Sequence, residues 1–534
     1  MMKVRRVVGL ALISGALAIP GSALAQAPAA APPAAAAPAG DYTVIPLAEK
    51  MFSGGRETSA AQTLGRNVAK VLSGEMALGD EPLFDVYYTR HLFAMHTQTD
   101  PKSLAKLPKE RSNFLRNHIQ KTRRPEIHDH LVQLTFRSMK DIASNNYHPA
   151  VRYHAMMIIG DLNSKEMTTP GPSGTPPVPL AEARDFMLAE LGNAKQVDAV
   201  RVAALLGILR HAEISAYGAP LAPAAKQNIV KVILPLATDK NVPADRSPEG
   251  HAWMRSRAVE VLAYLGRPQY DAPLVQTLTT IMADSNEPTS LRFAALTSLG
   301  RMNLSGATNF SGDQLARQMA MLAVQATREL LAPIDDQLTA EKEKARLSGG
   351  GPGGYGGYSG GGPGGYSGGA GYPGGGPGGM GGTVVKTPQQ LKEEARLTIV
   401  QRVLKDHMLK TRIGLDGADG KSGAVTAAKV ASQKDYIKKV SDAVTALAKV
   451  SDMKDARTEG PPRLADLSKE MRAKMGDLDR IAKTGGAPAA PAAAPESPEG
   501  PEGPGEGPDA VSAAPGESPD ATAAVAPAAA RRTP

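Results

Sequence analysis

Several kinds of residue are scarce or absent in this chain of 534 residues, and each absence narrows the choice of structure. There is no cysteine, so no disulfide bond can stabilise the fold and no lipid can be attached through a thiol. Stability must come instead from a large apolar core. Aromatic residues make up only 4% of the chain, and the apolar residues are mostly alanine and aliphatic, which favours packed helices over a β-sandwich.

The N-terminus has the three parts of a bacterial secretory signal. Basic residues at positions 3, 5 and 6 come first, an apolar run over residues 7–19 follows, and Ala23-Leu24-Ala25 precedes Gln26. This pattern predicts a cleaved signal peptide over residues 1–25, with cleavage between Ala25 and Gln26. The apolar run is shorter than the roughly 20 residues of a membrane-spanning helix, and no later segment reaches that length. We therefore expect an exported protein, periplasmic or extracellular, with no transmembrane span in the mature chain.

The net charge of +8 is unevenly distributed. Residues 486–534 carry seven acidic side chains against two arginines, so the mature body without this tail and the signal has a charge of about +10. A basic surface outside the cytoplasm favours an anionic envelope polymer or an acidic protein as partner, and nucleic acid is not expected. A basic surface that is merely solvated is the simpler interpretation.

Low-complexity segments divide the chain. Residues 26–40 form an Ala/Pro linker, residues 348–383 a Gly/Tyr-rich segment and residues 486–534 a Pro/Ala/Glu tail, and we expect all three to be disordered. Helical patterning fills residues 41–347 and resumes over residues 384–485. We expect this C-terminal helical segment to pack on the first, with the Gly/Tyr-rich segment as a long loop inside one domain. A linker between two domains is the alternative.

Four segments of the first helical region share one pattern. Each has an arginine, then an alanine three places later and a branched aliphatic residue seven places later, and these offsets lie on one face of a helix. A small alanine lets a second helix approach closely. The arginines and alanines are Arg152 and Ala155, Arg201 and Ala204, Arg255 and Ala258, and Arg292 and Ala295.

An amphipathic segment precedes each copy of the pattern, so the sequence predicts a helix, a turn and a second helix, repeated four times. Such pairs bury their apolar faces against their neighbours in an α-solenoid. The predicted fold class is therefore all-α, an irregular α-solenoid of helix pairs with disordered linkers.

The second helices resemble those of HEAT repeats over about residues 126–303. Pro149-Ala150-Val151-Arg152 followed by Gly160 matches the HEAT pattern of proline, Val-Arg, small and aliphatic residues and glycine, and Leu291-Arg292 with Gly300 is similar. This chain departs from the family in one respect, since HEAT repeats tend to carry an acidic residue six places before the arginine. Here those places hold Asn146, Lys195, Glu249 and Asn286. The resemblance implies a scaffold or adaptor that binds other macromolecules, although some HEAT-like proteins are lyases or enzyme subunits.

No catalytic constellation is evident in the sequence, and no cofactor or metal is expected. Tyr87, Tyr88, Arg90 and His91 are side chains of the kind enriched at interfaces, although core packing explains most of that stretch. His128 and His130 are two places apart, which points them to different faces of a helix. Two GxSxG matches fall in the glycine-rich segment, and the calcium-like stretch 415–423 lacks a closing glutamate.

The sequence therefore predicts an exported, non-enzymatic scaffold or binding protein that uses its helical surface to bind a protein or an anionic envelope polymer. An enzyme or enzyme subunit is the first alternative, with a site in residues 84–130. A pocket that gathers Tyr87, Arg90, His91, His128 and His130 would favour it, and dispersal of these residues would count against it. A structural component of the envelope is the second alternative.

Overall fold

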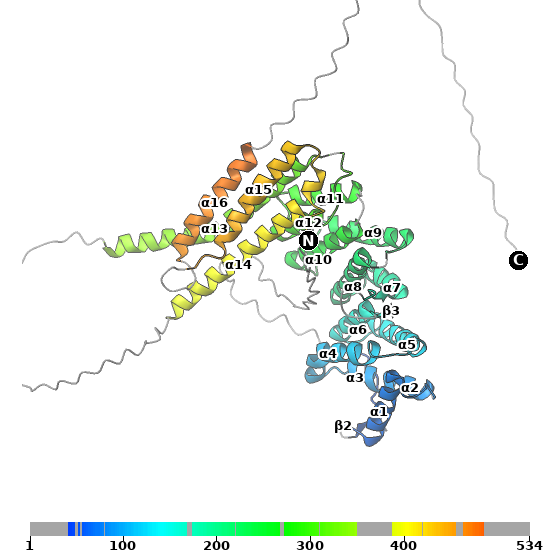
Figure 1. Ribbon diagram of the computed structural model, residues 1–534. Coiled ribbons are helices and arrows are strands. Elements are labelled where there is room, and N and C mark those ends of the chain that lie inside the picture. Colours follow the sequence, from blue (N-terminus) through cyan, green and yellow to red (C-terminus); the bar gives the residue numbers. More distant parts are fainter. Residues whose placement is uncertain are drawn as a thin grey trace, which may run out of the picture. The chain divides into compact units, whose positions relative to one another are not determined.

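The computed structural model describes a large part of the chain, and that part is all-α as predicted (Figure 1). The described residues are 41–48, 52–53, 56–79, 81–167, 174–218, 220–266, 272–308, 310–349, 387–418, 420–454 and 463–484. The predicted signal with its Ala25–Gln26 cleavage site, the Ala/Pro linker, the Gly/Tyr-rich segment from residue 350 and the acidic tail lie outside them.

Short helices and two π-helical turns make up the N-terminal part. Tyr88–Leu92 and Leu115–Ile119 are wound as π-helix, which is rare and occurs as single turns inside α-helices. The elements are β1 (Phe52–Ser53), β2 (Arg56–Glu57), α1 (Ser59–Ser73), α2 (Glu81–Tyr87), η1 (Tyr88–Leu92), α3 (Phe93–His96), α4 (Pro101–Phe114) and η2 (Leu115–Ile119). Strands β1 and β2 form a two-stranded antiparallel sheet.

Four helix pairs follow, at the positions of the four sequence repeats. Their bounds are α5 (Pro125–Ser144) and α6 (Pro149–Asp161), α7 (Ala181–Gly192) and α8 (Asp198–Tyr217), α9 (Pro223–Thr238) and α10 (Pro248–Leu265), and α11 (Ala272–Ala283) and α12 (Thr289–Gly300). The two helices of each pair pack on each other. A small antiparallel sheet of β3 (Asn163–Lys165) and β4 (Val178–Pro179) lies between the first two pairs in the sequence.

Local sequence signals set the starts of these helices. Pro149 is the first residue of α6, where its missing N–H costs nothing, and the Nδ1 atom of His148 accepts a hydrogen bond from the N–H of Ala150. Ser247 caps α10 in the same way by accepting from the N–H of Gly250 at 3.0 Å. These caps set where the helices begin, and the apolar residues determine which face of each helix is buried.

The second helices pack on one another in chain order. Helix α6 contacts α8, α8 contacts α10, and α10 contacts α12 (Figure 1). The repeat alanines Ala155, Ala204, Ala258 and Ala295 are all buried. Gly160 and Gly207 bring α6 and α8 especially close, since a Cβ at Gly207 would lie 3.0 Å from the Cα of Gly160.

The C-terminal helices form a bundle that continues from the fourth pair. They are α13 (Gly312–Gly349), α14 (Pro388–Asp416), the 3-10 turn η3 (Ala424–Ala427), α15 (Ala431–Val450) and α16 (Leu464–Thr484). Helix α14 packs on α12, and α13 packs on α14, α15 and α16. The ring of His407 on α14 stacks on Phe293 of α12, with 4.3 Å between ring centroids.

Gly300 of α12 lies directly against the backbone of α14, which leads to a prediction. A Cβ at this position would overlap the backbone carbonyl of Ile413, so Gly300→Ala should force the two helices apart. We expect it to lower the free energy of unfolding by about 1–3 kcal/mol. Gly476→Ala is the matched control, because nothing lies within 4 Å of that Cβ and alanine favours helix, so we expect a gain of about 0.5–1 kcal/mol. Urea unfolding followed by circular dichroism measures both changes, and a neutral Gly300→Ala variant would contradict the close crossing.

Candidate binding surface

The four repeat arginines have the same structural role. Each donates a hydrogen bond from Nε to a backbone carbonyl of the preceding helix, at N–O distances of 3.0–3.2 Å. The carbonyl belongs in each case to the second-to-last residue of that helix, where it has no partner within the helix. The acceptors are Ala143 for Arg152, Leu191 for Arg201, Ala237 for Arg255 and Met282 for Arg292. The repeated arginine therefore joins the two helices of its own pair.

Three of these arginines also bind the following part of the chain. Arg152 donates to the side-chain oxygen of Gln196, and Arg292 donates to Gln325 of α13 at 2.7 Å. The guanidinium of Arg255 makes two hydrogen bonds of 2.7 Å to the carboxylate of Glu287. Gln196 and Glu287 each lie five places before the next arginine, rather than the six places of the HEAT pattern, so the HEAT spacing does not identify them.

A set of large aromatic and cationic side chains lies on α8 and α10 and at the residue that follows α12, and all of them except the buried Tyr264 are partly or largely exposed. We call this group the aromatic patch, and its members are Tyr217, Trp253, Arg257, Tyr264 and Arg301. Trp253 is the single tryptophan of the chain. Because aromatic residues are so scarce in this protein, their presence together at a partly exposed surface is a distinctive feature.

Contacts between neighbouring helices hold the patch in place. The ring of Tyr264 on α10 meets Tyr217 on α8 edge to face, at 6.1 Å between centroids, and the guanidinium of Arg301 lies 5.0 Å from the Tyr264 ring. The Tyr264 hydroxyl lies 3.4 Å from a carboxylate oxygen of Glu213, to which it donates. Burial raises the pKa of Tyr264 to about 12, so its hydroxyl stays a donor at neutral pH. On α10 the guanidinium of Arg257 lies 5.5 Å from the Trp253 ring.

Two members of the patch, Tyr264 and Arg301, occupy a position of the repeat that the arginine and alanine pattern does not include. Nine places after the arginines the chain has Asp161, Arg210, Tyr264 and Arg301. Neighbouring members of this series interact, since Asp161 and Arg210 lie 3.7 Å apart and Arg301 covers Tyr264. This offset, compared across the four copies, is the signal in the sequence that marks where neighbouring second helices meet.

The predicted interface residues Tyr87, Tyr88, Arg90 and His91 have different positions. Tyr88 is fully buried, and its hydroxyl and the Nδ1 atom of His118 are 3.1 Å apart. The ring of His91 is buried and stacks on Tyr87 at 5.1 Å between centroids. Arg90 is exposed. Three of the four side chains therefore belong to an aromatic core cluster around η1 and η2, as the core-packing interpretation expects.

His128 and His130 point to different neighbours on α5. The Nε2 atom of His130 lies 2.6 Å from a carboxylate oxygen of Asp85, whereas that of His128 lies 3.6 Å from Glu166. The Glu166 carboxylate, close enough to pair with a protonated ring, raises the pKa of His128. Tyr87, Arg90, His91, His128 and His130 are thus not gathered in a single pocket, which was the arrangement that would favour an enzyme.

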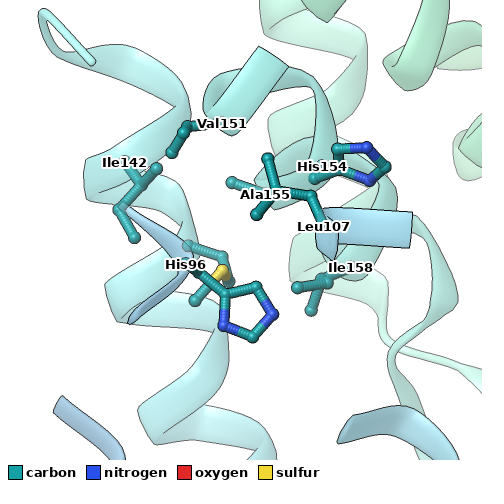
Figure 2. Close-up of a pocket in the computed structure, with 8 residues that line it drawn as sticks. His96, Leu107, Ile142, Val151, His154, Ala155 and Ile158 are labelled. Carbon is teal, nitrogen blue, oxygen red and sulfur yellow. The ribbon is translucent and has the colours of Figure 1, made fainter. Parts of the chain in front are cut away.

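A second pair of histidines lines a narrow buried space between α3, α4 and α6 (Figure 2). His96 and His154 border this space together with Leu107 and Ile158, and the space is too narrow to admit water. Neither the Nε2 atom of His96 nor the Nδ1 atom of His154 has a hydrogen-bond partner in the described structure. Burial lowers the pKa of His154 to about 4, so this ring is neutral at pH 7.

A more open cavity of about 300 Å³ lies between α5 and the segment 41–48. Thr89, Arg137, Ser138 and Asp141 supply its polar lining, and Ile45 and Phe93 the apolar part. Across the described residues, no three His, Asp or Glu side chains are arranged to hold a metal ion. The same part of the chain has no helix long and apolar enough to cross a membrane.

The calcium-like stretch folds as a turn against the fourth pair. Asp416 accepts a hydrogen bond of 2.6 Å from the hydroxyl of Ser441, and the N–H of Gly423 donates to the carbonyl of Met302. The two GxSxG matches lie outside the described residues. In comparisons with known proteins, no family model, no curated protein and no solved structure matches this chain.

Proposed function

We propose that this chain is an exported, non-enzymatic scaffold of HEAT-like helix pairs that binds a protein partner through the aromatic patch. The observation that carries the proposal is that Tyr217 on α8, Trp253 and Arg257 on α10, and Arg301 directly after α12 remain partly or largely exposed. Tyrosine, tryptophan and arginine are enriched at protein interfaces and supply most of the binding energy there.

The packing of the helices supports the HEAT-like interpretation. Each second helix contacts the next, and the repeated arginine makes the same contact with the first helix of its pair in all four copies. In an α-solenoid of this kind the exposed edges of the second helices form an extended surface. The aromatic patch lies along such edges on α8 and α10 and directly after α12.

The signal sequence supports export, with cleavage before Gln26 and a mature protein in the periplasm or outside the cell. The partner is accordingly a protein of the envelope or the surroundings. The alternative of a catalytic site in residues 84–130 gains no support, because Tyr87 and His91 pack in a core cluster and His128 and His130 have separate partners.

Affinity capture of the tagged mature protein from the envelope of its source organism tests the proposal. We expect one protein partner to stay bound in high salt, since the aromatic contacts are not screened by ions. Trp253→Ala and Tyr217→Ala should each weaken the binding of that purified partner by about 30-fold or more, the effect of removing a strong interface contact.

The matched control is Leu409→Ala, which shortens another exposed large side chain on α14. We expect this variant to bind as the unchanged protein does. Tyr217 is 66% exposed, so its replacement should leave the thermal midpoint of unfolding unchanged. Any loss of binding is then due to the lost contact between Tyr217 and the partner. Equal binding by all three variants, or recovery of anionic polymer alone at low salt, would contradict the proposal.

A further inference from the structure

A second surface, independent of the aromatic patch, lies on the N-terminal helices. Residues 101–124, which form α4, η2 and the following turn, contain eight lysines and arginines and one acidic residue, Glu110, a net charge of +7. This is most of the charge of about +10 that the mature body carries. No other separate segment of 24 residues in the described structure has so large a net charge.

Four of these cations share one side of a helix. Lys102, Lys106, Lys109 and Arg116, which we call the basic row, are all exposed, and their spacings of four, three and seven residues place them on one face. The row is about 21 Å long at 1.5 Å per residue. The opposite face is fixed to the protein, because Leu107 and Phe114 are buried and α4 packs on α6.

The charges of the basic row are not neutralised within the described structure. None of the four side chains forms a salt bridge in the described structure, and their only side-chain hydrogen bond there is a long one of 3.4 Å from Arg116 to Ser112. Glu110 does not belong to this face, since it is partly buried and acts on His96. The row therefore presents uncompensated positive charge to the solvent.

Exposed apolar side chains occur in the same N-terminal helices. Met76, Leu83 and Val86 are exposed large apolar residues, and they lie in the α1–α2 connection and on α2. Lysines next to anionic headgroups, with apolar side chains in the interfacial layer, are the two contacts by which a protein binds to a bilayer surface without spanning it. A soluble polyanion would use the lysines alone.

We propose that the basic row binds the phosphate groups of anionic phospholipids and holds the N-terminal helices against a bilayer surface. Phosphate is the chemistry that unpaired lysines and an arginine recognise, and a row on one helix face reaches several headgroups of a plane at once. Each basic residue near such a surface increases binding about fivefold. This inference does not rest on the proposed protein partner, because the aromatic patch is built from α8, α10 and the residue after α12.

Sedimentation of the full mature chain with vesicles tests this proposal. The vesicles contain phosphatidylglycerol and phosphatidylcholine in equal parts, or phosphatidylcholine alone. We expect binding to the anionic vesicles only, with release when the salt concentration is raised. The triple variant K102Q/K106Q/K109Q should bind the anionic vesicles about 100-fold more weakly.

Lys434, Lys438 and Lys439 provide the matched control, because they are three exposed lysines on α15. The variant K434Q/K438Q/K439Q has the same net charge as the first triple variant and should keep its vesicle binding. Circular dichroism at increasing temperature verifies that both variants fold. Trp253→Ala should bind vesicles normally, which separates this proposal from the preceding one.

Three outcomes would overturn the proposal. The first is equal binding to phosphatidylcholine vesicles. The second is an equal loss of binding in both triple variants, because net charge alone would then decide binding. The third is a preference for soluble polyphosphate over anionic vesicles at equal phosphate concentration. A loss confined to K102Q/K106Q/K109Q on anionic vesicles supports the basic row as the lipid-binding surface.

Discussion

Arg255→Met is expected to lower the free energy of unfolding by about 3–5 kcal/mol, because it leaves a buried carboxylate without its partner. Arg255 is 4% exposed and Glu287 is 6% exposed, and two hydrogen bonds of 2.7 Å join them. Without the guanidinium, the Glu287 carboxylate stays buried with only the exposed Lys240 nearby, at 3.6 Å. The carbonyl of Ala237 at the end of α9 also loses its donor.

A matched pair of variants shows whether the loss of stability comes from the buried carboxylate or from the repeat position of the arginine. Arg201 has the same place in its own pair and also donates to a helix-end carbonyl, but its contact with Asp198 is longer, at 3.5 Å, and more exposed. We expect Arg201→Met to cost about 1 kcal/mol. The double variant Arg255→Met/Glu287→Met should recover much of the loss, because no charge remains unpaired. Urea unfolding measures all three, and an equal cost for Arg201→Met and Arg255→Met would contradict the argument.

The protein is also expected to lose stability as the pH falls from about 6.5 to about 4. Burial is the main cause that lowers the pKa of His118, His154 and His407 to about 4 and that of His211 to about 3. The ordinary pKa of histidine is about 6.5, so below that pH the unfolded chain binds protons that the folded chain excludes. The neutral rings make their full contribution to the free energy of unfolding above pH 6.5, and this contribution is lost as the pH falls towards 4.

The size of the effect follows from the shifts. One pKa unit corresponds to about 1.4 kcal/mol, so several buried histidines together account for several kcal/mol, a large share of the 5–15 kcal/mol typical of folded proteins. His128 acts in the opposite direction, because the nearby Glu166 carboxylate raises its pKa and stabilises the fold at lower pH. It is a single group against five, because burial also lowers the pKa of His96.

Unfolding by urea at pH 7.5, 6, 5 and 4.5 measures this dependence. The variant His211→Leu/His407→Phe should unfold at higher urea than the unchanged protein at pH 4.5, because two of the groups that take up protons on unfolding are gone. His407→Phe keeps the stacking on Phe293 that the imidazole now provides. A free energy of unfolding that is constant from pH 7.5 to 4.5 would show that these rings are not excluded from solvent.

The helix pairs could be predicted from the sequence because the relevant information is local. The arginine, the alanine three places later and the aliphatic residue seven places later recur within single helices, and the structure places a second helix at each of the four copies. The contacts between pairs were not predictable in the same way. Gln196 and Glu287 lie in turns before their helices, where one residue of difference in the spacing changes the partner.

The candidate surfaces show the same limit. The aromatic patch combines side chains from α8, α10 and the residue after α12 that are up to 84 residues apart, so the sequence offers only the offset of nine places as a signal. The predicted N-terminal interface residues have the chemical type common at interfaces, but Tyr88 and His91 are buried. The charge of residues 101–124 is visible in the sequence, whereas its exposure on one face and its lack of partners depend on the fold.

The close crossing of Gly300 and α14 has a consequence for how this chain can change by duplication. Helix α12 packs between α10 and α14, and Gly300 fits only against the backbone at Ile413. A copy of the second or third pair inserted after α12 would place Leu209 or Ala263 at the position of Gly300 against α14, without that fit. A copy inserted before α12 would keep the junction. The number of pairs in descendants of this gene should therefore vary on the N-terminal side of α12, while α12 and the C-terminal bundle are inherited together as one block.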